Sequence, residues 1–222
     1  MMALNRTASR LGSPVELMRS ARLIPVLTIH HEDQAVPLAQ ALVAGGIWML
    51  EVTLRTPAGA AAARAIRDQV PDAVVGLGTV LTVRDLELAR ELGLAFAFSP
   101  GVTPELLDAA ADLGVPFVPG VQTASELMQA LARGFTVVKF FPAGSAGGIP
   151  ALKALAGPFP EACFCPTGGI NEDAVAEWLA LPNVVAVGGS WLVPAADLER
   201  SDWAAITGRA QRAMARLDAG KT

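Results

Sequence analysis

Cationic side chains are scarce in this 222-residue sequence, which carries a net charge of −4. Without an excess of lysine and arginine, the chain offers no basic surface for nucleic acid. No apolar stretch reaches the roughly 18 residues of a membrane span, because proline, glycine or a charged residue interrupts each one. Residues 1–10 are polar and lack the apolar core of a secretory signal. We therefore expect a cytoplasmic protein whose partner is neither nucleic acid nor a membrane.

Cysteine and histidine are rare as well, with two of each in the sequence. Cys163 and Cys165 are separated by one residue, which on a strand places their Cα atoms roughly 6–7 Å apart, an awkward distance for a disulfide. With only His30 and His31 elsewhere, the pair is a poor candidate for a zinc site. We interpret the cysteines as two buried reduced thiols. The histidines are interpreted as solvated loop residues, with contacts to a substrate at the rim of a site as the alternative.

Apolar residues, in contrast, make up 52% of the chain and occur in short runs. Along the sequence, a run rich in β-branched residues, a turn and a segment with helical spacing follow one another repeatedly. Near-continuous apolar runs are typical of parallel strands that are covered on both faces. Eight runs are predicted to be strands: residues 24–29, 47–52, 73–77, 95–98, 116–118, 136–140, 162–165 and 184–187.

Segments with helical periodicity lie between these runs. Several begin at a threonine or asparagine that can cap a helix, as at Thr82, Thr103, Thr123 and Asn171. The predicted helices span residues 14–21, 33–44, 82–92, 103–113, 123–132, 171–180 and 202–217.

Eight strand–helix units at a spacing of roughly 20–26 residues predict an α/β protein with a closed (β/α)8 TIM barrel. The segment 14–21 is expected to be an extra N-terminal helix that closes the bottom of the barrel. An open doubly wound sheet is the alternative, although such sheets more commonly have five or six parallel strands. No linker or low-complexity segment divides the sequence, so we expect one domain over residues 1–222.

Catalytic side chains of a TIM barrel lie at the carboxyl ends of the strands, so polar residues late in the apolar runs are candidates. Lys139 lies within Val-Val-Lys-Phe-Phe, where a charged ammonium is costly to desolvate. Burial favours the free amine, which is the nucleophile that attacks a ketone to form an imine. A structural ion pair with a carboxylate is the alternative interpretation.

Glu51 and Arg55 belong to the end of the second predicted strand. As a catalyst, Glu51 would move protons beside the amine; otherwise it is the ion-pair partner of Lys139 or Arg55. Arg55 can hold a carboxylate with two parallel hydrogen bonds, or it is a solvated loop charge.

Paired glycines follow the seventh and eighth predicted strands, at 168–169 and 188–189. These are the loops where barrels of this class commonly bind phosphate. Glycines let backbone N–H groups approach an anion, and the helix predicted from Asn171 would turn its N-terminus toward it. Tight turns also use paired glycines, and this remains the alternative.

Six stretches of the sequence, in order, resemble the 2-keto-3-deoxy-6-phosphogluconate (KDPG) aldolase family of class I aldolases. The similarity extends from about residue 25 to residue 195. The stretches are Glu-Val-Thr-Leu-Arg-Thr at 51–56, Gly-Leu-Gly-Thr-Val-Leu at 76–81, Phe-Ser-Pro-Gly at 98–101, Lys-Phe-Phe-Pro-Ala at 139–143, Phe-Cys-Pro-Thr-Gly-Gly-Ile at 164–170 and Gly-Gly-Ser-Trp-Leu-Val-Pro at 188–194.

The resemblance implies a homotrimeric barrel that needs no metal and no other cofactor. It implies that Lys139 is the lysine that forms a Schiff base and that Glu51 shuttles protons. Arg55 and Thr79 fall on positions that hold the carboxylate end of the substrate, with Pro100 lining the same pocket. The hydroxyls and the phosphate of the substrate would be received by Thr167, Gly168, Gly169, Gly188, Gly189 and Ser190.

The family cleaves KDPG to pyruvate and glyceraldehyde 3-phosphate in the Entner–Doudoroff pathway, and many members also cleave 4-hydroxy-2-oxoglutarate (KHG). A related branch that acts on the galactonate epimer lacks arginine at the position of Arg55, so Arg55 indicates the gluconate substrate. The chain departs from some members at 144–148, where Gly-Ser-Ala-Gly-Gly replaces Glu-Ala-Asn-Gly-Gly. The alternative functions are a 2-keto-3-deoxy-6-phosphogalactonate aldolase, a metal-dependent aldolase, a sugar-phosphate isomerase and a non-catalytic sugar-phosphate-binding barrel.

Overall fold

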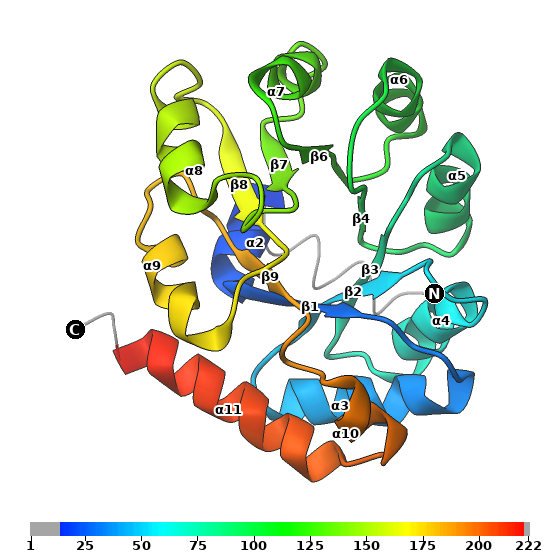
Figure 1. Ribbon diagram of the computed structural model, residues 1–222. Coiled ribbons are helices and arrows are strands. Elements are labelled where there is room, and N and C mark those ends of the chain that lie inside the picture. The colour runs from blue at the N-terminus through cyan, green and yellow to red at the C-terminus, as the bar shows by residue number, and fades with distance from the viewer. Residues whose placement is uncertain (1–13, 220–222) are drawn as a thin grey trace.

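The structure is a computed structural model that describes residues 14–219, so the polar segment 1–10 lies outside the described residues. It has an α/β fold with parallel strands, as predicted. One sheet has six strands in the order β5-β4-β3-β2-β1-β9, and a second has three in the order β6-β7-β8. Isolated parallel bridges join Phe164 to Val184 and Thr167 to Gly188, and so connect β8 to the chain around β9. Figure 1 shows the strands at the centre of the molecule with helices around them.

The strands lie at or near the predicted positions. The fifth predicted strand, 116–118, is matched by β5, and Pro119 separates β5 from a further short strand, β6, because proline has no N–H to donate to a neighbouring strand. The prediction for the last strand is displaced: β9 begins only at Val187, and the buried Val184 makes an isolated bridge. The bounds are β1 Leu23–Leu27, β2 Met49–Thr53, β3 Val74–Gly78, β4 Phe96–Phe98, β5 Phe117–Val118, β6 Gly120–Val121, β7 Val137–Phe140, β8 Cys163–Pro166 and β9 Val187–Gly189.

The helices follow the predicted caps where the sequence provides them. The side chains of Thr82, Thr103, Thr123 and Asn171 each accept a backbone N–H from the first turn that follows. The elements at predicted positions are α2 Pro14–Ala21, η1 Glu32–Gln34, α3 Ala35–Ala44, α5 Val83–Glu91, α6 Pro104–Leu113, α7 Ala124–Leu131, η2 Glu172–Ala174, α9 Val175–Leu179 and α11 Trp203–Ala219.

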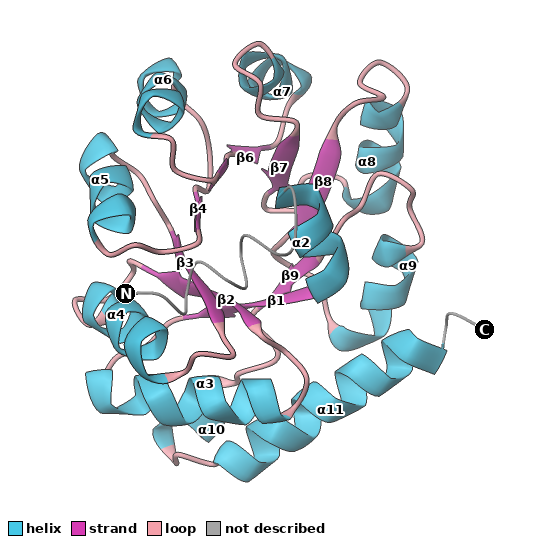
Figure 2. Cartoon of the chain, turned by 180° about the vertical axis from the view of Figure 1, so that it is seen from behind, coloured by secondary structure: helices cyan, strands magenta, loops and turns pink. Residues whose placement is uncertain are grey.

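Three helices lie outside the predicted segments: α4 Gly59–Gln69, α8 Gly148–Ala156 and α10 Ala195–Glu199. None of the three begins with a side-chain cap. Figure 2 shows that α4 and α8 belong to the outer layer of helices, like their capped neighbours. The buried apolar side chains of all three belong to the main apolar cluster, so these helices form through tertiary packing rather than from a local start signal.

Alternation along the strands divides the buried side chains between two apolar clusters. The larger cluster lies between strands and helices and includes Leu50 and Val52 of β2. The smaller, inner cluster includes Met49 of β2 and Val137 of β7. Because successive side chains point to opposite faces, Glu51 follows Met49 and Lys139 follows Val137 on the inner face. The periodicity of the strands thus directs both polar side chains to the interior.

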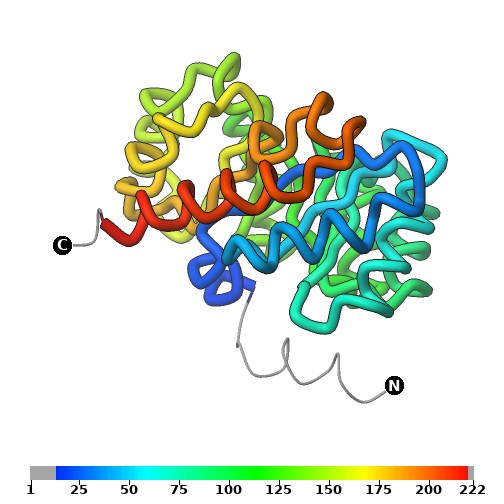
Figure 3. Tube along the Cα trace, turned by 90° about the horizontal axis from the view of Figure 1, so that it is seen from below, coloured from blue at the N-terminus to red at the C-terminus, as the bar shows by residue number. Residues whose placement is uncertain are grey.

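Helix α11 packs along α3, as Figure 3 shows from below. A Cβ atom on Gly45 would collide with the Cβ atom of Ala210, so glycine permits this close approach. The hydroxyl of Thr207 on α11 donates to the carbonyl of Ala41 on α3 at 2.9 Å. Among residues 14–219, no helix combines the length and the apolar character that a membrane span requires.

Candidate active site

Lys139 of β7 and Glu51 of β2 meet across the interior, although their strands are not paired with each other. Lys139 Nζ lies 2.8 Å from Glu51 Oε1 and 3.1 Å from Oε2. The two residues are 3% and 1% exposed. The ion pair considered from the sequence is therefore present. The same hydrogen bond also gives the carboxylate direct access to the ammonium proton, so a structural pair and a catalytic pair are compatible in this geometry.

Aromatic rings surround the amine, a feature that the sequence analysis missed. Lys139 Nζ lies 5.2 Å from the centre of the Phe98 ring and 5.6 Å from the centre of the Phe141 ring. The face of an aromatic ring attracts a cation and also excludes water. The amine is thus held in an apolar pocket in which Glu51 is its charged partner.

Two glycines in the strands leave the space that polar side chains occupy. A Cβ atom on Gly78 of β3 would collide with Glu51 Oε1, and one on Gly188 of β9 would collide with Thr167 Oγ1. Glycine inside a strand is the sequence signal for such a close approach. Gly78 therefore contributes to the position of the Glu51 carboxylate.

Arg55 and Thr79 follow β2 and β3, which are neighbouring strands, and they form one unit. Arg55 Nε donates to Thr79 Oγ1 at 3.1 Å. Thr79 has a φ of 61°, which is a left-handed conformation that is uncommon for a β-branched residue. Strain of this kind persists where the surrounding structure holds a residue in place, often at functional sites.

The first glycine loop, Gly168 and Gly169, has φ angles of 95° and 73°. It packs against the segment 144–148, at which the chain departs from some relatives. The backbone N–H of Gly144 donates to the carbonyl of Gly168 at 2.9 Å, and that of Ala143 donates to the carbonyl of Thr167 at 2.8 Å. The segment 144–148 therefore borders the glycine loop where phosphate binding is expected.

The second glycine loop ends β9 with Gly188 and Gly189, and the exposed Ser190 follows. The bridge between Thr167 and Gly188 holds the two loops side by side. The helix expected from Asn171 is instead a 3-10 turn followed by the short α9. That turn carries two acidic side chains, Glu172 and Asp173, and the side chain of Asn171 already accepts the backbone N–H of Ala174, so an anion at this N-terminus stays a prediction. Backbone N–H groups of the glycine loops are the other candidates for binding the phosphate.

The remaining predicted residues lie around the same ends of the strands. Pro100 directly follows Ser99 beyond β4 and is partly buried. His30 and His31 are exposed, as predicted, and line a hollow together with Ser190. Contact of these histidines with a substrate at the rim stays a prediction. Within the described part of the chain, no group of three or more histidine, cysteine, aspartate or glutamate residues is placed to hold a metal ion.

Both cysteines are free thiols. The expectation that both are buried is wrong for Cys163, which is partly exposed at the start of β8, whereas Cys165 is buried. Cys165 pairs in register with Lys139. Burial raises the pKa of the Cys165 thiol to about 12, so this neighbour of the Lys139–Glu51 pair is uncharged at neutral pH.

An amine and a carboxylate in a water-poor pocket can form and resolve an imine with a ketone. An arginine–threonine pair and two glycine loops at the same strand ends offer N–H donors that can hold anionic groups. These are the features that a site for a negatively charged carbonyl compound requires.

Comparison with known proteins agrees with this description. The family model for KDPG and KHG aldolase matches residues 15–209. The 2-dehydro-3-deoxy-phosphogluconate aldolase of Pseudoalteromonas atlantica is 47% identical over 203 residues, which cover 91% of this chain and 94% of that protein. The KHG/KDPG aldolase of Escherichia coli K12 is 47% identical over 202 residues, or 91% of this chain and 95% of that protein.

Solved structures include the KDPG aldolase of Legionella pneumophila with pyruvate captured as a covalent carbinolamine intermediate. It has a TM-score of 0.88 and 46% sequence identity, and the match covers 90% of this chain and 98% of that one. The chain belongs to the KDPG and KHG aldolase family, and the resemblance seen in its sequence is confirmed.

Proposed function

We propose that this protein is a class I aldolase that cleaves KDPG to pyruvate and glyceraldehyde 3-phosphate and also accepts KHG. The observation that carries the proposal is the buried hydrogen bond of 2.8 Å between Lys139 Nζ and Glu51 Oε1. Support for the substrates comes from the names of the relatives, and support for a covalent intermediate comes from the Legionella protein.

In the first half of the reaction, Glu51 accepts the ammonium proton of Lys139, which frees the lone pair on Nζ. Nζ attacks the C2 carbonyl carbon of the substrate, and the carbonyl oxygen becomes the hydroxyl of a carbinolamine. Glu51 protonates this hydroxyl, which leaves as water, and a protonated imine remains. The imine then accepts the electron pair of the C3–C4 bond as that bond breaks.

In the second half, Glu51 acts on the carbon skeleton. Through a water molecule, its carboxylate takes the proton of the C4 hydroxyl, so that C4 leaves as the aldehyde carbon of glyceraldehyde 3-phosphate. Glu51 then returns this proton to C3 of the enamine. Water hydrolyses the resulting imine, which releases pyruvate and regenerates Lys139.

Residues at the neighbouring strand ends hold the two anionic groups of the substrate. Arg55 and Thr79 bind the carboxylate next to C2, and Pro100 lines this pocket. Binding of the phosphate positions the reacting carbons, so its binding energy contributes to the rate. The groups that bind the hydroxyls and the phosphate are the side chain or backbone of Thr167, Gly168, Gly169, Gly188, Gly189 and Ser190.

Trapping with pyruvate and borohydride tests the nucleophile. The sequence has three lysines, and Lys153, exposed on α8, is a matched control for Lys139. Wild type and Lys153→Ala should each gain one reduced pyruvyl group per chain, measured by mass spectrometry. Lys139→Ala should gain none, and its turnover should fall by more than about 10³-fold. An adduct on a different side chain, or cleavage by Lys139→Ala at the wild-type rate, would contradict the proposal.

A coupled lactate dehydrogenase assay for released pyruvate tests the substrate. We expect the highest kcat/KM with KDPG and lower values with the galactonate epimer and KHG. A sugar-phosphate isomerase or a non-catalytic binding protein would release no pyruvate. Loss of activity to a chelator would instead favour a metal-dependent aldolase.

We also infer that the strands form one closed barrel of eight β/α units within a single domain over residues 1–222. In this arrangement β5 and β6 count as one strand, and the order continues through β7 and β8 to β9. Support comes from the pairing of β9 with β1 and from the bridges between β8 and the chain around β9. Met18 and Ala21 of α2 belong to the inner cluster, which supports a role for this helix in closing one end.

The proposed oligomeric state and cellular compartment are supported mainly by membership of the family. We propose a homotrimer, as the resemblance implies, and a cytoplasmic enzyme without a cofactor. The two free thiols are in keeping with a reducing compartment.

A further inference from the structure

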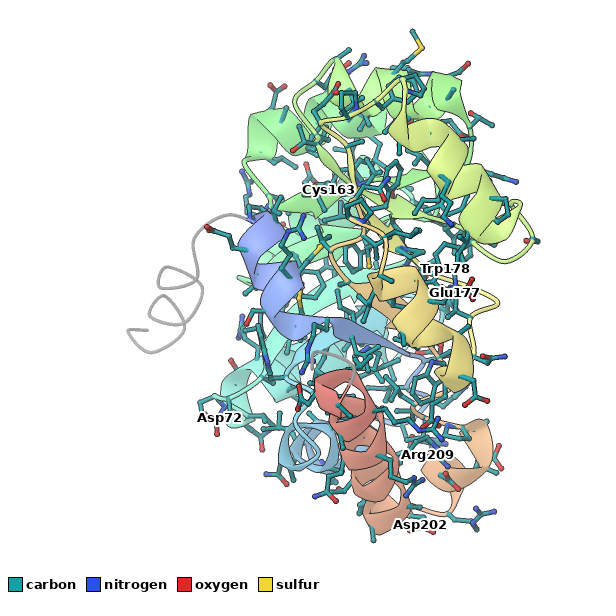
Figure 4. All side chains as sticks on the ribbon, turned by 90° about the vertical axis from the view of Figure 1, so that its left-hand side faces the viewer. Asp72, Cys163, Glu177, Trp178, Asp202 and Arg209 are labelled. Atoms are coloured by element: carbon teal, nitrogen blue, oxygen red, sulfur yellow. The ribbon has the colours of Figure 1, made fainter. Side chains whose placement is uncertain are left out.

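A second cavity lies at the opposite ends of the strands from Lys139. Its volume is about 360 Å³, and α2, α9, α11 and the segment before β9 surround it. Arg22 directly precedes β1 and Val185 precedes β9, whereas Lys139 lies late in β7 and Arg55 and Thr79 follow the ends of β2 and β3. Figure 4 faces this side of the molecule, where α9 carries the labelled Glu177 and Trp178.

The lining of this cavity is cationic and aliphatic. Among the described residues that line it, three are arginines, Arg19, Arg22 and Arg216, and none is acidic. The other lining residues are apolar: Ala176, Leu179, Ala180, Val184, Val185 and Leu217. A hollow that combines apolar walls with a few convergent charges is typical of a site for a small molecule.

Arg22 has a strained backbone and an unsatisfied side chain. Its φ is 62°, a conformation that glycine adopts without strain and arginine does not. The side chain is 15% exposed, and Nη2 pairs with Asp218 Oδ1 at 2.8 Å. Nη1 is buried and donates to no acceptor among residues 14–219. A buried donor without an acceptor requires an explanation, and a bound anion is one.

Other hydrogen-bond donors lie next to Arg22. Arg19 Nη2 lies 3.5 Å from the carbonyl oxygen of Pro182, at the limit of a hydrogen bond. Asn183 Nδ2, one residue before the lining residue Val184, is another buried donor without an acceptor in the described structure. Arg216 is different, because it already pairs with acidic residues of η2, Glu172 and Asp173. The buried cationic donor that lacks an acceptor in the described part of the chain is therefore Arg22 Nη1, beside which the exposed Arg19 adds a second positive charge.

We infer that this cavity binds a carboxylate that carries a short aliphatic chain. The carboxylate accepts the N–H of Arg22 Nη1, and Arg19 supplies a second positive charge. The aliphatic chain lies on Leu179, Val184 and Leu217, which an inorganic anion would leave uncovered. This site is separate from the proposed aldolase site and does not depend on the aldolase reaction.

The test measures thermal unfolding with and without butyrate in the full-length protein. Binding to the folded state at ten times the dissociation constant should raise the wild-type Tm by about 3–6 °C. Arg22→Gly removes the guanidinium and relieves the φ strain, so it should lose this rise while its Tm without butyrate stays near the wild-type value. Arg19→Gln should reduce the rise, and Arg64→Gln, an exposed arginine on α4, should leave it unchanged.

Butyrate bound at the proposed pyruvate site is distinguished by its competition with substrate. The inhibition constant for pyruvate release should be the same in wild type and Arg22→Gly, because Arg55 and Thr79 are intact. A full rise of Tm in Arg22→Gly would overturn the inference. An equal rise of Tm with inorganic phosphate that also depends on Arg22 would overturn it as well. A third contradicting result is a Tm of Arg22→Gly without butyrate that lies below the wild-type value by as much as butyrate raises the wild-type Tm, because Arg22 would then be a structural residue.

Discussion

At the scale of the residue, the Lys139–Glu51 hydrogen bond serves both stability and the proposed chemistry. Both side chains are buried, so removal of one leaves a charge without a partner in the interior. Such a loss typically costs roughly 3–5 kcal/mol of the free energy of unfolding. Substitutions that preserve size are therefore the informative ones, because they separate a loss of chemistry from a loss of folding.

Glu51→Gln should keep a hydrogen bond to Lys139 but cannot move protons. We expect kcat to fall by about 10²–10⁴-fold, with KM changed by only a few-fold, because the carboxylate acts on the reaction steps rather than on binding. Steady-state kinetics with KDPG measures both parameters. Glu161→Gln, at an exposed position, is the matched control. A large rise in KM with an unchanged kcat would show that Glu51 acts in substrate binding only.

Gly78→Ala tests the space beside the carboxylate. The new methyl group would collide with Glu51 Oε1, so either the carboxylate or the backbone must move. We expect kcat to fall by at least about tenfold, and the free energy of unfolding to fall by about 1–3 kcal/mol from overpacking. Gly157→Ala is the control, since a Cβ atom there meets nothing within 4 Å. Wild-type kinetics for Gly78→Ala would exclude a role for this glycine in positioning Glu51.

At the scale of the element, helix starts are set by local hydrogen bonds, and α7 has the fullest set. Thr123 Oγ1 accepts the backbone N–H of Glu126 at 3.3 Å. Glu126 Oε2 accepts the backbone N–H groups of Gln122 and Thr123, each at 2.8 Å. Burial by itself would raise the pKa of Glu126, but these hydrogen bonds outweigh it and the pKa lies below its usual 4.5.

The lowered pKa of Glu126 predicts a pH dependence of stability. A carboxyl group whose pKa is lowered by folding stabilises the protein above its unfolded pKa, and this contribution disappears as the pH falls through the folded value. At pH 7, Glu126→Gln should lower the free energy of unfolding by about 0.5–1 kcal/mol. Urea unfolding at a series of pH values should show this difference shrinking below pH 4.5. A difference that is constant between pH 7 and pH 3 would contradict a charge-dependent cap.

Three helices were not predicted and the last strand was misplaced, and the local sequence of these elements shows why. Capped helices such as α5, α6 and α7 were found because a threonine marks their first turn. Helices α4, α8 and α10 have no capping side chain, and their buried apolar side chains belong to the main apolar cluster. The last strand was placed too early because the run from Val184 to Ala186 is as buried and apolar as a strand without being one.

The proposed trimer is a property of the whole molecule, and the mass of the assembly tests it. Leu81 and Met128, which are 60% and 59% exposed, are large apolar side chains that the described surface leaves uncovered. Side chains of this kind are often covered in an assembly. Sedimentation equilibrium should give three times the chain mass of 23.0 kDa. A mass of one or two chains at micromolar concentration would refute the proposed trimer.

Lys139 and Glu51 were identifiable as candidates because a charge inside an apolar run is unusual whatever the fold. The surroundings of the pair were not identifiable in this way. Phe98 comes from β4 and Gly78 from β3, and each looks like an ordinary strand residue until the strands are placed beside each other. The same holds for the segment at Gly144, which reaches the glycine loop at Gly168 only through the pairing of β7 with β8.

Features that depend on neighbours a few residues away could be predicted from the order of the amino acids. These are the alternation that turns Glu51 and Lys139 to the inner face, the threonine caps and the motifs of the family. The contacts between distant residues became known from the folded chain: Lys139 Nζ with Glu51, Arg55 with Thr79, and Arg22 with its cavity. The physical reason is that periodicity and capping act over one or two turns of chain, whereas these contacts depend on the register between strands far apart in sequence.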